Sequence, residues 1–227
     1  QRDFKDNRWQ RAICVGAGDG VTPYGVVSGW QLTKRPLPQL YEKSITPIAW
    51  RSPGGQMDFT PLSEGRGVAI APHTDCQVIL DMGELVTSYV QLQMEGGRHS
   101  RVQLLYSECY GYKDPTTGEI RKGDRTDFLH GDLYGETDVY WKGDGGQWYE
   151  PFFFRTFRYL RIAIYTQDQP LFLKQVLFRM TGYPLAIETR FQATQPQIQA
   201  MWDVSVRTLE RCMHETYEDC PYYEQMQ

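Results

Sequence analysis

Apolar and polar side chains alternate along several short segments between residues 67 and 190. Residues 101–108 and 159–165 show the alternation most clearly, and a period of two is typical of a strand with one buried face. Turn-forming clusters separate the segments, as at residues 95–100 and 143–147. No long helical pattern interrupts them, which favours an antiparallel β-sandwich or jelly roll over a parallel sheet. The predicted strands span residues 77–82, 85–94, 101–108, 137–143, 157–165 and 171–180.

The period changes near Gln192, where apolar residues begin to recur at spacings of three and four. This spacing predicts an amphipathic helix that runs to about His214. Pro196 suits the first turn of such a helix, and Thr194 with Gln197 forms the sequence pattern of a capping box. An apolar helix face needs a partner, and little chain follows to supply one. We therefore expect a second, helical domain of which only the start is present.

The chain thus divides into three predicted segments, and the predicted fold class is mainly β. Residues 1–66 are broken by turns and are expected to form irregular strands and loops, in the manner of the end of a preceding β-domain. Residues 67–190 are expected to form the β-sandwich or jelly-roll domain. Residues 191–227 are expected to be the truncated start of the helical domain.

Composition narrows the possible partners. The chain has 227 residues, of which 41% are hydrophobic and 23% charged, as in an ordinary globular protein. No stretch approaches the roughly twenty apolar residues of a membrane helix, so no membrane partner is expected. The net charge is −4 and no basic stripe is present, which argues against nucleic acid. The five cysteines are scattered, so neither a zinc knuckle nor a dense disulfide scaffold is expected. The oligomeric state is not defined.

Two predicted loops contain residue types that are found in ligand sites, but the spacing of these residues does not match the known site patterns. The glycine-rich residues 15–21 resemble a phosphate loop, but Pro23 and Gly25 follow, so no helix opens from the glycines as a dinucleotide site requires. The acidic residues 124–138 could supply oxygen ligands to calcium, yet their spacing does not match an EF-hand loop. A solvated loop is favoured there, the calcium question stays open, and no metal-binding residue is predicted.

Carboxylates and tyrosines gather at the end of the sequence, from residue 215 onward. Asp219 and Glu224 lie there close to Tyr222 and Tyr223, just past the predicted helix. Glycoside hydrolysis uses such a combination, because a partly desolvated carboxyl group can protonate a leaving oxygen while rings and carboxylates bind the sugar. Acidic helix ends are also common, so this pattern by itself leaves a purely structural role open.

Residues 219–225, Asp-Cys-Pro-Tyr-Tyr-Glu-Gln, resemble the signature that opens the catalytic domain of α-L-rhamnosidases of glycoside hydrolase family 78. Residues 78–108, which end in Glu108, and residues 137–162 are similar to β-domain segments of that family. Residues 191–209 are similar to its lead into the catalytic domain. The four stretches occur in the order of the family. They depart from it at Tyr222 and Tyr223, where many members carry arginine and further acidic residues.

The resemblance implies an (α/α)6 barrel after the β-domain and an exo-glycosidase that inverts configuration at terminal α-L-rhamnosides. Glu224 is then the general acid, and Asp219 contacts the rhamnose hydroxyls. The general base is expected beyond Gln227, roughly 6.5–9.5 Å from the acid, so that residues 1–227 alone are expected to be inactive. The resemblance implies rhamnose-containing glycosides or polysaccharides as partners, no cofactor, and a secreted or periplasmic location.

Two readings without catalysis compete with this one. A carbohydrate-binding β-sandwich would stack sugar on Trp141, Trp148 or Tyr149. A purely structural β-sandwich would pack against a neighbouring domain and bind no sugar. Sugar affinity of the isolated segment would separate the two.

Overall fold

The computed structural model describes residues 5–14, 21–22, 25–26, 34–55 and 57–224. The chain divides into two compact units, Gln1–Pro38 and Gln39–Gln227. In the first unit, β1 (Val21–Thr22) and β2 (Gly25–Val26) form an antiparallel pair. Most of the glycine-rich segment predicted to be a turn lies outside the described residues.

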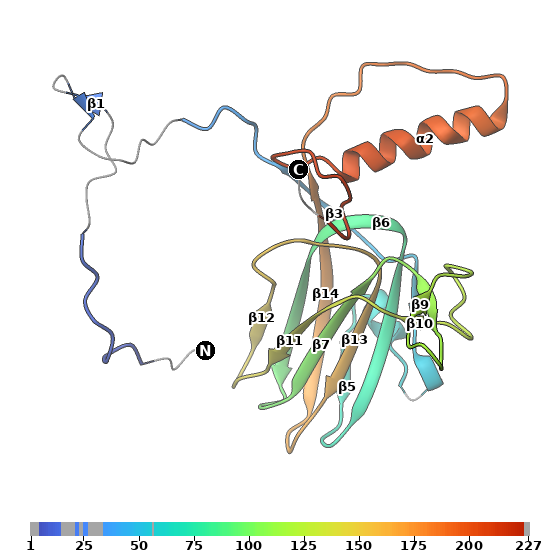
Figure 1. Cartoon of the computed structure of the whole chain (residues 1–227). Helices are drawn as coiled ribbons and strands as arrows, with labels where there is room; N and C mark the ends of the chain where they lie inside the picture. The colour runs from blue at the N-terminus through green and yellow to red at the C-terminus, as the bar shows by residue number, and fades with distance from the viewer. Residues whose placement is uncertain (1–4, 15–20, 23–24, 27–33, 56, 225–227) are drawn as a thin grey trace. The chain divides into compact units, whose positions relative to one another are not determined.

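The second unit is built on one antiparallel sheet, which in the described part of the chain has nine strands (Figure 1). This confirms the predicted mainly β, antiparallel sandwich fold. Two of the strands precede Gly67, so residues predicted to be irregular also supply part of the sheet. The strands are β3 (Tyr41–Ile45), β4 (Ala49–Arg51), β5 (Val68–Ile70), β6 (Asp75–Gly96), β7 (Arg101–Ser107), β11 (Glu136–Trp141), β12 (Gln147–Tyr149), β13 (Arg155–Tyr165) and β14 (Leu171–Gly182).

The long strand β6 belongs to both layers of the sandwich. Its first part, residues 75–88, pairs with β13, and its second part, residues 88–96, pairs with β14. The layer around the first part continues through β13 to β7 and β11, whereas β14 carries β3 and β5 at its other edge. Side chains between the layers form the core, because alternate residues of each strand face inward. Fully buried members of this core include Leu80, Leu92, Leu104, Phe157, Ile162 and Leu173.

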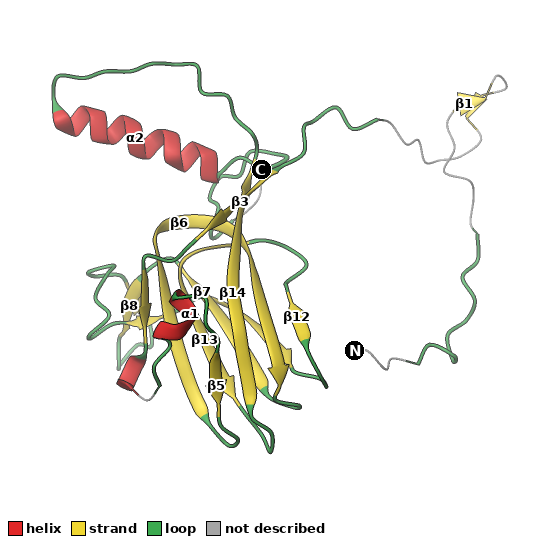
Figure 2. Cartoon of the chain, turned by 180° about the vertical axis from the view of Figure 1, so that it is seen from behind, coloured by secondary structure: helices red, strands yellow, loops and turns green. Residues whose placement is uncertain are grey.

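A smaller sheet lies beside the main one and forms part of the wall of a cavity described below. It comprises β8 (Tyr110–Lys113), β9 (Ile120–Arg121) and β10 (Asp132–Leu133), in the order β10-β8-β9. A second apolar cluster, separate from the main core, includes residues of this sheet and of the main sheet: Ile79, Leu105, Tyr110, Leu133 and Tyr159. Two short helical turns also belong to this unit, η1 (Pro53–Gly55) and α1 (Thr60–Ser63), of which α1 lies against β14 (Figure 2).

The predicted C-terminal helix is present as α2 (Pro196–Arg211), with Pro196 in its first turn as expected. The predicted capping box is wrong. Gln195 is the N-cap, in an extended conformation, and no side chain caps it. The cause is Pro196, because the residue before a proline is driven out of the helical region and Thr194 is thereby left outside the helix. No helix in the described ranges is long and apolar enough to cross a membrane.

The helix also ends at Arg211, three residues before the predicted end at His214. Met213 forms a β-bridge with Tyr217, and its carbonyl oxygen accepts a hydrogen bond of 2.9 Å from the backbone N–H of Tyr183. These backbone contacts with other parts of the chain replace the next helical turn.

An irregularity in β6 anchors the end of α2. Between Asp81 and Val86 the register of β6 against β13 shifts, so that residues 82–85 bulge out of the ladder. The Arg211 guanidinium donates to the carbonyl oxygen of Leu85 at 3.2 Å and to the Glu84 carboxylate at 3.1 Å. From this attachment α2 projects away from the sandwich (Figure 1).

Candidate functional site

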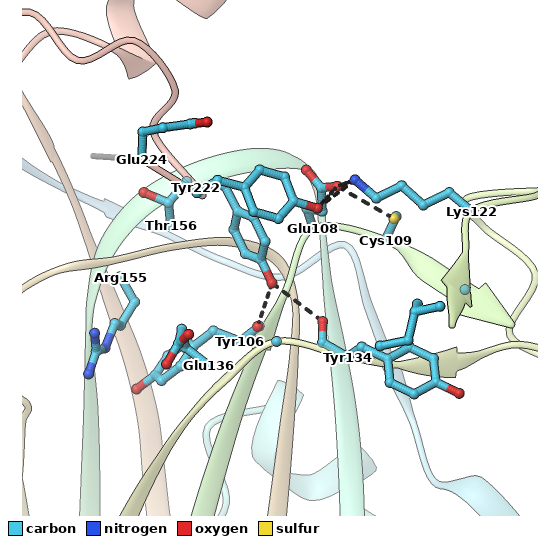
Figure 3. Close-up of a pocket in the computed structure, with 14 residues that line it drawn as sticks. Tyr106, Glu108, Cys109, Lys122, Tyr134, Glu136, Arg155, Thr156, Tyr222 and Glu224 are labelled. Carbon is cyan, nitrogen blue, oxygen red and sulfur yellow. Dashed lines mark hydrogen bonds and ion pairs between the residues drawn. The ribbon is translucent and has the colours of Figure 1, made fainter. Parts of the chain in front are cut away.

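A cavity of about 510 Å³ lies between the β-sandwich and the last described residues of the chain (Figure 3). One wall comes from the end of β7 and the small sheet, a second from the start of β13, and a third from the turn at residues 221–224. The cavity therefore joins parts of the sequence that lie more than 100 residues apart. Its lining includes Tyr106, Glu108, Lys122, Tyr134, Glu136, Arg155, Thr156, Tyr222, Tyr223 and Glu224.

Arg155 and Asp138 form an ion pair beside this cavity. The Nη2 atom of Arg155 lies 2.6 Å from Oδ1 of Asp138, and its Nε atom lies 3.3 Å from Oδ2. Because both ions are half-buried and doubly bonded, the geometry orients Arg155 more firmly than a single contact would. The hydrogen bond with Asp138 raises the pKa of Arg155, so its positive charge is retained.

Tyr222 is inserted between the sandwich and the turn. Its hydroxyl hydrogen-bonds the carbonyl oxygens of Tyr106, at 3.1 Å, and Tyr134, at 3.4 Å. Gly135 makes this approach possible, since a Cβ there would overlap both the Tyr106 carbonyl oxygen and the Tyr222 hydroxyl. Burial raises the pKa of Tyr222 to about 12, so the hydroxyl remains protonated and able to donate at neutral pH.

Glu108 lies at the centre of a second set of contacts with the turn. Its side chain is only 13% exposed and forms ion pairs with Lys122 and, at 3.1 Å, with Arg125. The Tyr223 hydroxyl donates to the same carboxylate at 2.8 Å and accepts from the Lys122 ammonium at 2.5 Å. We call these four residues the anchor cluster: Glu108, Lys122, Arg125 and Tyr223.

The anchor cluster keeps its acidic member ionised. Burial raises the pKa of Glu108, but the hydrogen bonds from Lys122 and Tyr223 and the two nearby cations outweigh it, so the pKa lies below its ordinary value. The hydrogen bond with Glu108 raises the pKa of Lys122 in turn. At neutral pH the cluster therefore holds one half-buried carboxylate, Glu108, between two exposed cations, and these contacts orient the Tyr223 hydroxyl.

The structure separates the two site residues predicted from the sequence. Glu224 is exposed and lines the cavity next to Tyr222 and Tyr223. Asp219 is also exposed but does not line this cavity. Glu108 and Lys122 were not predicted as site residues. The only sequence signal for Glu108 is its place at the end of residues 78–108, and Lys122 carries none.

In the acidic loop, residues 124–138, carboxylates accept hydrogen bonds that stabilise turns of the backbone. Asp127 accepts a hydrogen bond of 2.6 Å from the Tyr112 hydroxyl and further bonds from the backbone of Leu129 and His130. The bond from Tyr112 lowers the pKa of Asp127 to about 2. Across the described ranges, no three or more His, Cys, Asp or Glu side chains form a group that could hold a metal ion.

The three aromatic residues that would bind sugar in the alternative reading lie on β11 and β12, two strands that are consecutive in the sequence, but they differ in exposure. Trp141 on β11 and Trp148 on β12 are exposed. Tyr149 is half-buried, and its ring packs on that of Tyr140 with centroids 4.7 Å apart.

The fold defines an antiparallel β-sandwich domain. Residues 72–180 match the family model of the bacterial alpha-L-rhamnosidase concanavalin-like domain. The match lies within the predicted β-domain, and together with the structural similarities below it confirms the resemblance to α-L-rhamnosidases. No curated protein sequence matches the chain.

Solved rhamnosidase structures are similar to the chain. A family GH78 rhamnosidase of Bacillus sp. GL1 is 25% identical with a TM-score of 0.54, over 70% of this chain and 15% of that one. A Klebsiella oxytoca rhamnosidase with rhamnose bound is 18% identical with a TM-score of 0.60, over 83% and 38%. The α-L-rhamnosidase of Dictyoglumus thermophilum is 20% identical with a TM-score of 0.58, over 99% and 21%. The chain therefore spans well under half the length of each of these proteins.

Proposed function

We propose that this chain is part of an exo-acting α-L-rhamnosidase that hydrolyses terminal α-L-rhamnosides with inversion of configuration. The observation that carries the proposal is the position of Glu224. It stands in the stretch that resembles the rhamnosidase signature, and it lines the cavity against a β-domain that matches the rhamnosidase family model. The proposed substrates are rhamnose-containing glycosides or polysaccharides, and the proposed location is secreted or periplasmic.

In the proposed reaction the Glu224 carboxyl group donates its proton to the glycosidic oxygen as the bond to rhamnose breaks. A water molecule, deprotonated by a general base on the opposite face of the sugar, attacks the anomeric carbon. We propose that Asp219 binds rhamnose hydroxyls and that residues beyond Gln227 supply the base. Residues 1–227 alone are then inactive. No cofactor is required, because proton transfer and water attack account for every bond that changes.

The test is release of rhamnose from an aryl α-L-rhamnoside by the intact protein that contains this chain. Glu224→Gln should lower the rate by about 10²- to 10⁴-fold on a substrate with a poor leaving group, since general acid catalysis contributes that much. The matched control is Glu215→Gln, an exposed glutamate that does not line the cavity. NMR of the first rhamnose anomer released tests inversion.

An intact protein that cleaves no rhamnoside would contradict the proposal. Rhamnose affinity of residues 1–227 would then decide between the two remaining functions. Binding that is lost in Trp148→Ala favours the sugar-binding module, and absence of binding favours the structural one.

A further inference from the structure

Glu224 follows two tyrosines that attach the turn to the β-sandwich at separate points. The Tyr222 hydroxyl bonds the backbone of Tyr106 and Tyr134 (Figure 3). The Tyr223 hydroxyl bonds Glu108 and Lys122. The two rings are perpendicular, at 89°, with centroids 4.8 Å apart. Because the two attachments lie at separate points, they restrain both the position and the direction of the turn while they are formed.

The attachment at Tyr223 joins its hydroxyl to the ionised carboxylate of Glu108. Glu108 is nearly buried and receives two cations in addition to the Tyr223 hydroxyl. Removal of Lys122 would leave the Glu108 carboxylate, which is only 13% exposed, short of a bond, and that is costly.

We infer that Glu108 and Lys122 of the β-sandwich are positioning residues for the general acid, acting through Tyr223 on the direction of Glu224. The inference rests on the proposed function, and it assigns a catalytic purpose to the β-domain. It also gives a reason for Tyr223, one of the two positions at which the sequence departs from the rhamnosidase signature. A general acid must meet the leaving oxygen in a narrow geometry, and a displacement of about 1 Å can cost 10²-fold in rate.

The experiment uses the intact protein with Glu108→Gln, Lys122→Met and Tyr223→Phe. A misplaced acid slows substrates whose leaving group needs the proton and spares those whose leaving group departs as a stable anion. We expect kcat/KM to fall about ten- to a hundred-fold on an alkyl rhamnoside. On the 2,4-dinitrophenyl rhamnoside we expect the change to stay within about three-fold, since that leaving group needs little protonation.

The matched control is Glu95→Gln, which removes the carboxylate of another glutamate–lysine ion pair, with Lys174, outside the cavity. It should leave both substrates unchanged. Amide hydrogen exchange of residues 1–227 supplies a readout that needs no activity. Tyr223→Phe should speed exchange at residues 222–224 by about ten-fold, the effect of losing one charged hydrogen bond. Glu108→Gln should speed it by less, since the amide oxygen can still accept from the Tyr223 hydroxyl.

The two failures can be told apart. An intact protein without rhamnosidase activity overturns the proposed function, and with it the catalytic purpose of the anchor cluster. An active protein whose variants slow both substrates equally, or leave exchange at residues 222–224 unchanged, overturns the positioning role alone. A selective loss on the alkyl substrate, with faster exchange, supports it.

Discussion

The β-sandwich and the C-terminal segment, residues 183–224, are stabilised in different ways. The sandwich has a continuous core of fully buried aliphatic and aromatic side chains drawn from both layers. The C-terminal segment has a helix whose apolar residues Ile198, Met201, Val204 and Leu209 are exposed. Arg211, Tyr222 and Tyr223 fasten this segment to the sandwich through hydrogen bonds and ion pairs.

The difference means that the contacts that stabilise the sandwich are not the contacts that position the side chains of the C-terminal segment. Burial of apolar area stabilises the sandwich without directing any one side chain. Polar contacts contribute less free energy but fix distance and direction. The segment that carries Glu224 therefore depends on the sandwich as a rigid surface, and it is expected to open locally at a lower free energy than the sandwich unfolds.

The largest effect is expected in the core of the sandwich. Phe157→Ala removes a fully buried ring that packs on Tyr106 and Phe178. It should lower the free energy of unfolding by about 3–5 kcal/mol, because it leaves a cavity between the layers. Urea unfolding of residues 1–227 measures this. Phe152→Ala is the control, since that ring is fully exposed, and equal losses in the two variants would contradict the described core.

A smaller effect is expected where α2 meets β6. Arg211 has a side chain only 9% exposed and bonds both Glu84 and the Leu85 carbonyl. Arg211→Ala should destabilise the attachment of α2 by about 1.5–3 kcal/mol, the range for charged hydrogen bonds. Amide exchange along residues 200–211 reports the change.

Arg207 provides an internal comparison. It pairs with the same Glu84 at 3.2 Å, but its side chain is 48% exposed. Solvent screens such a pair, so Arg207→Ala should cost only about 0–1 kcal/mol. If the two arginine variants had the same effect, burial would not be what distinguishes their contacts.

The sequence predicts more of the β-sandwich than of the C-terminal segment, because the sandwich strands follow a local pattern whereas the contacts of the segment join distant residues. The strands β6, β7, β13 and β14 are predictable because alternation is a local property of the sequence. The anchor cluster is not, since Glu108 and Tyr223 are 115 residues apart and meet only once the sandwich has folded. The capping box failed for a local reason: the pattern ignored what Pro196 does to the residue before it.

Tyr222 tests a neutral contact of the C-terminal segment. Tyr222→Phe keeps the ring and removes the hydroxyl that bonds the carbonyl oxygens of Tyr106 and Tyr134. Local opening of residues 221–224 should become easier by about 0.5–1.5 kcal/mol, as for one neutral hydrogen bond. Tyr217→Phe, at an exposed ring, is the control. Exchange that is equal in both variants would show that the ring alone places Tyr222.

The smallest effect is expected from acid, and its sign follows from Glu108. Burial raises the pKa of Glu108, but the hydrogen bonds from Lys122 and Tyr223 and the nearby cations lower this pKa by more than burial raises it. The folded protein therefore favours the carboxylate. Its contribution is therefore complete above the ordinary pKa of about 4.5 and is lost as the pH falls below that value. Protonation removes the charge but leaves a carbonyl oxygen that still accepts from Tyr223, which is why the effect is small.

The exchange rate at residues 222–224 of Glu108→Gln, divided by that of the unmodified chain at the same pH, isolates this titration. The division cancels the intrinsic pH dependence of exchange and the other carboxylates. Lys122, whose pKa is raised, keeps its charge over this range, so the ratio follows the titration of Glu108. The ratio should be highest above pH 4.5 and approach one in acid. A ratio that stays constant with pH would mean that shape, and not charge, makes Glu108 fit the turn.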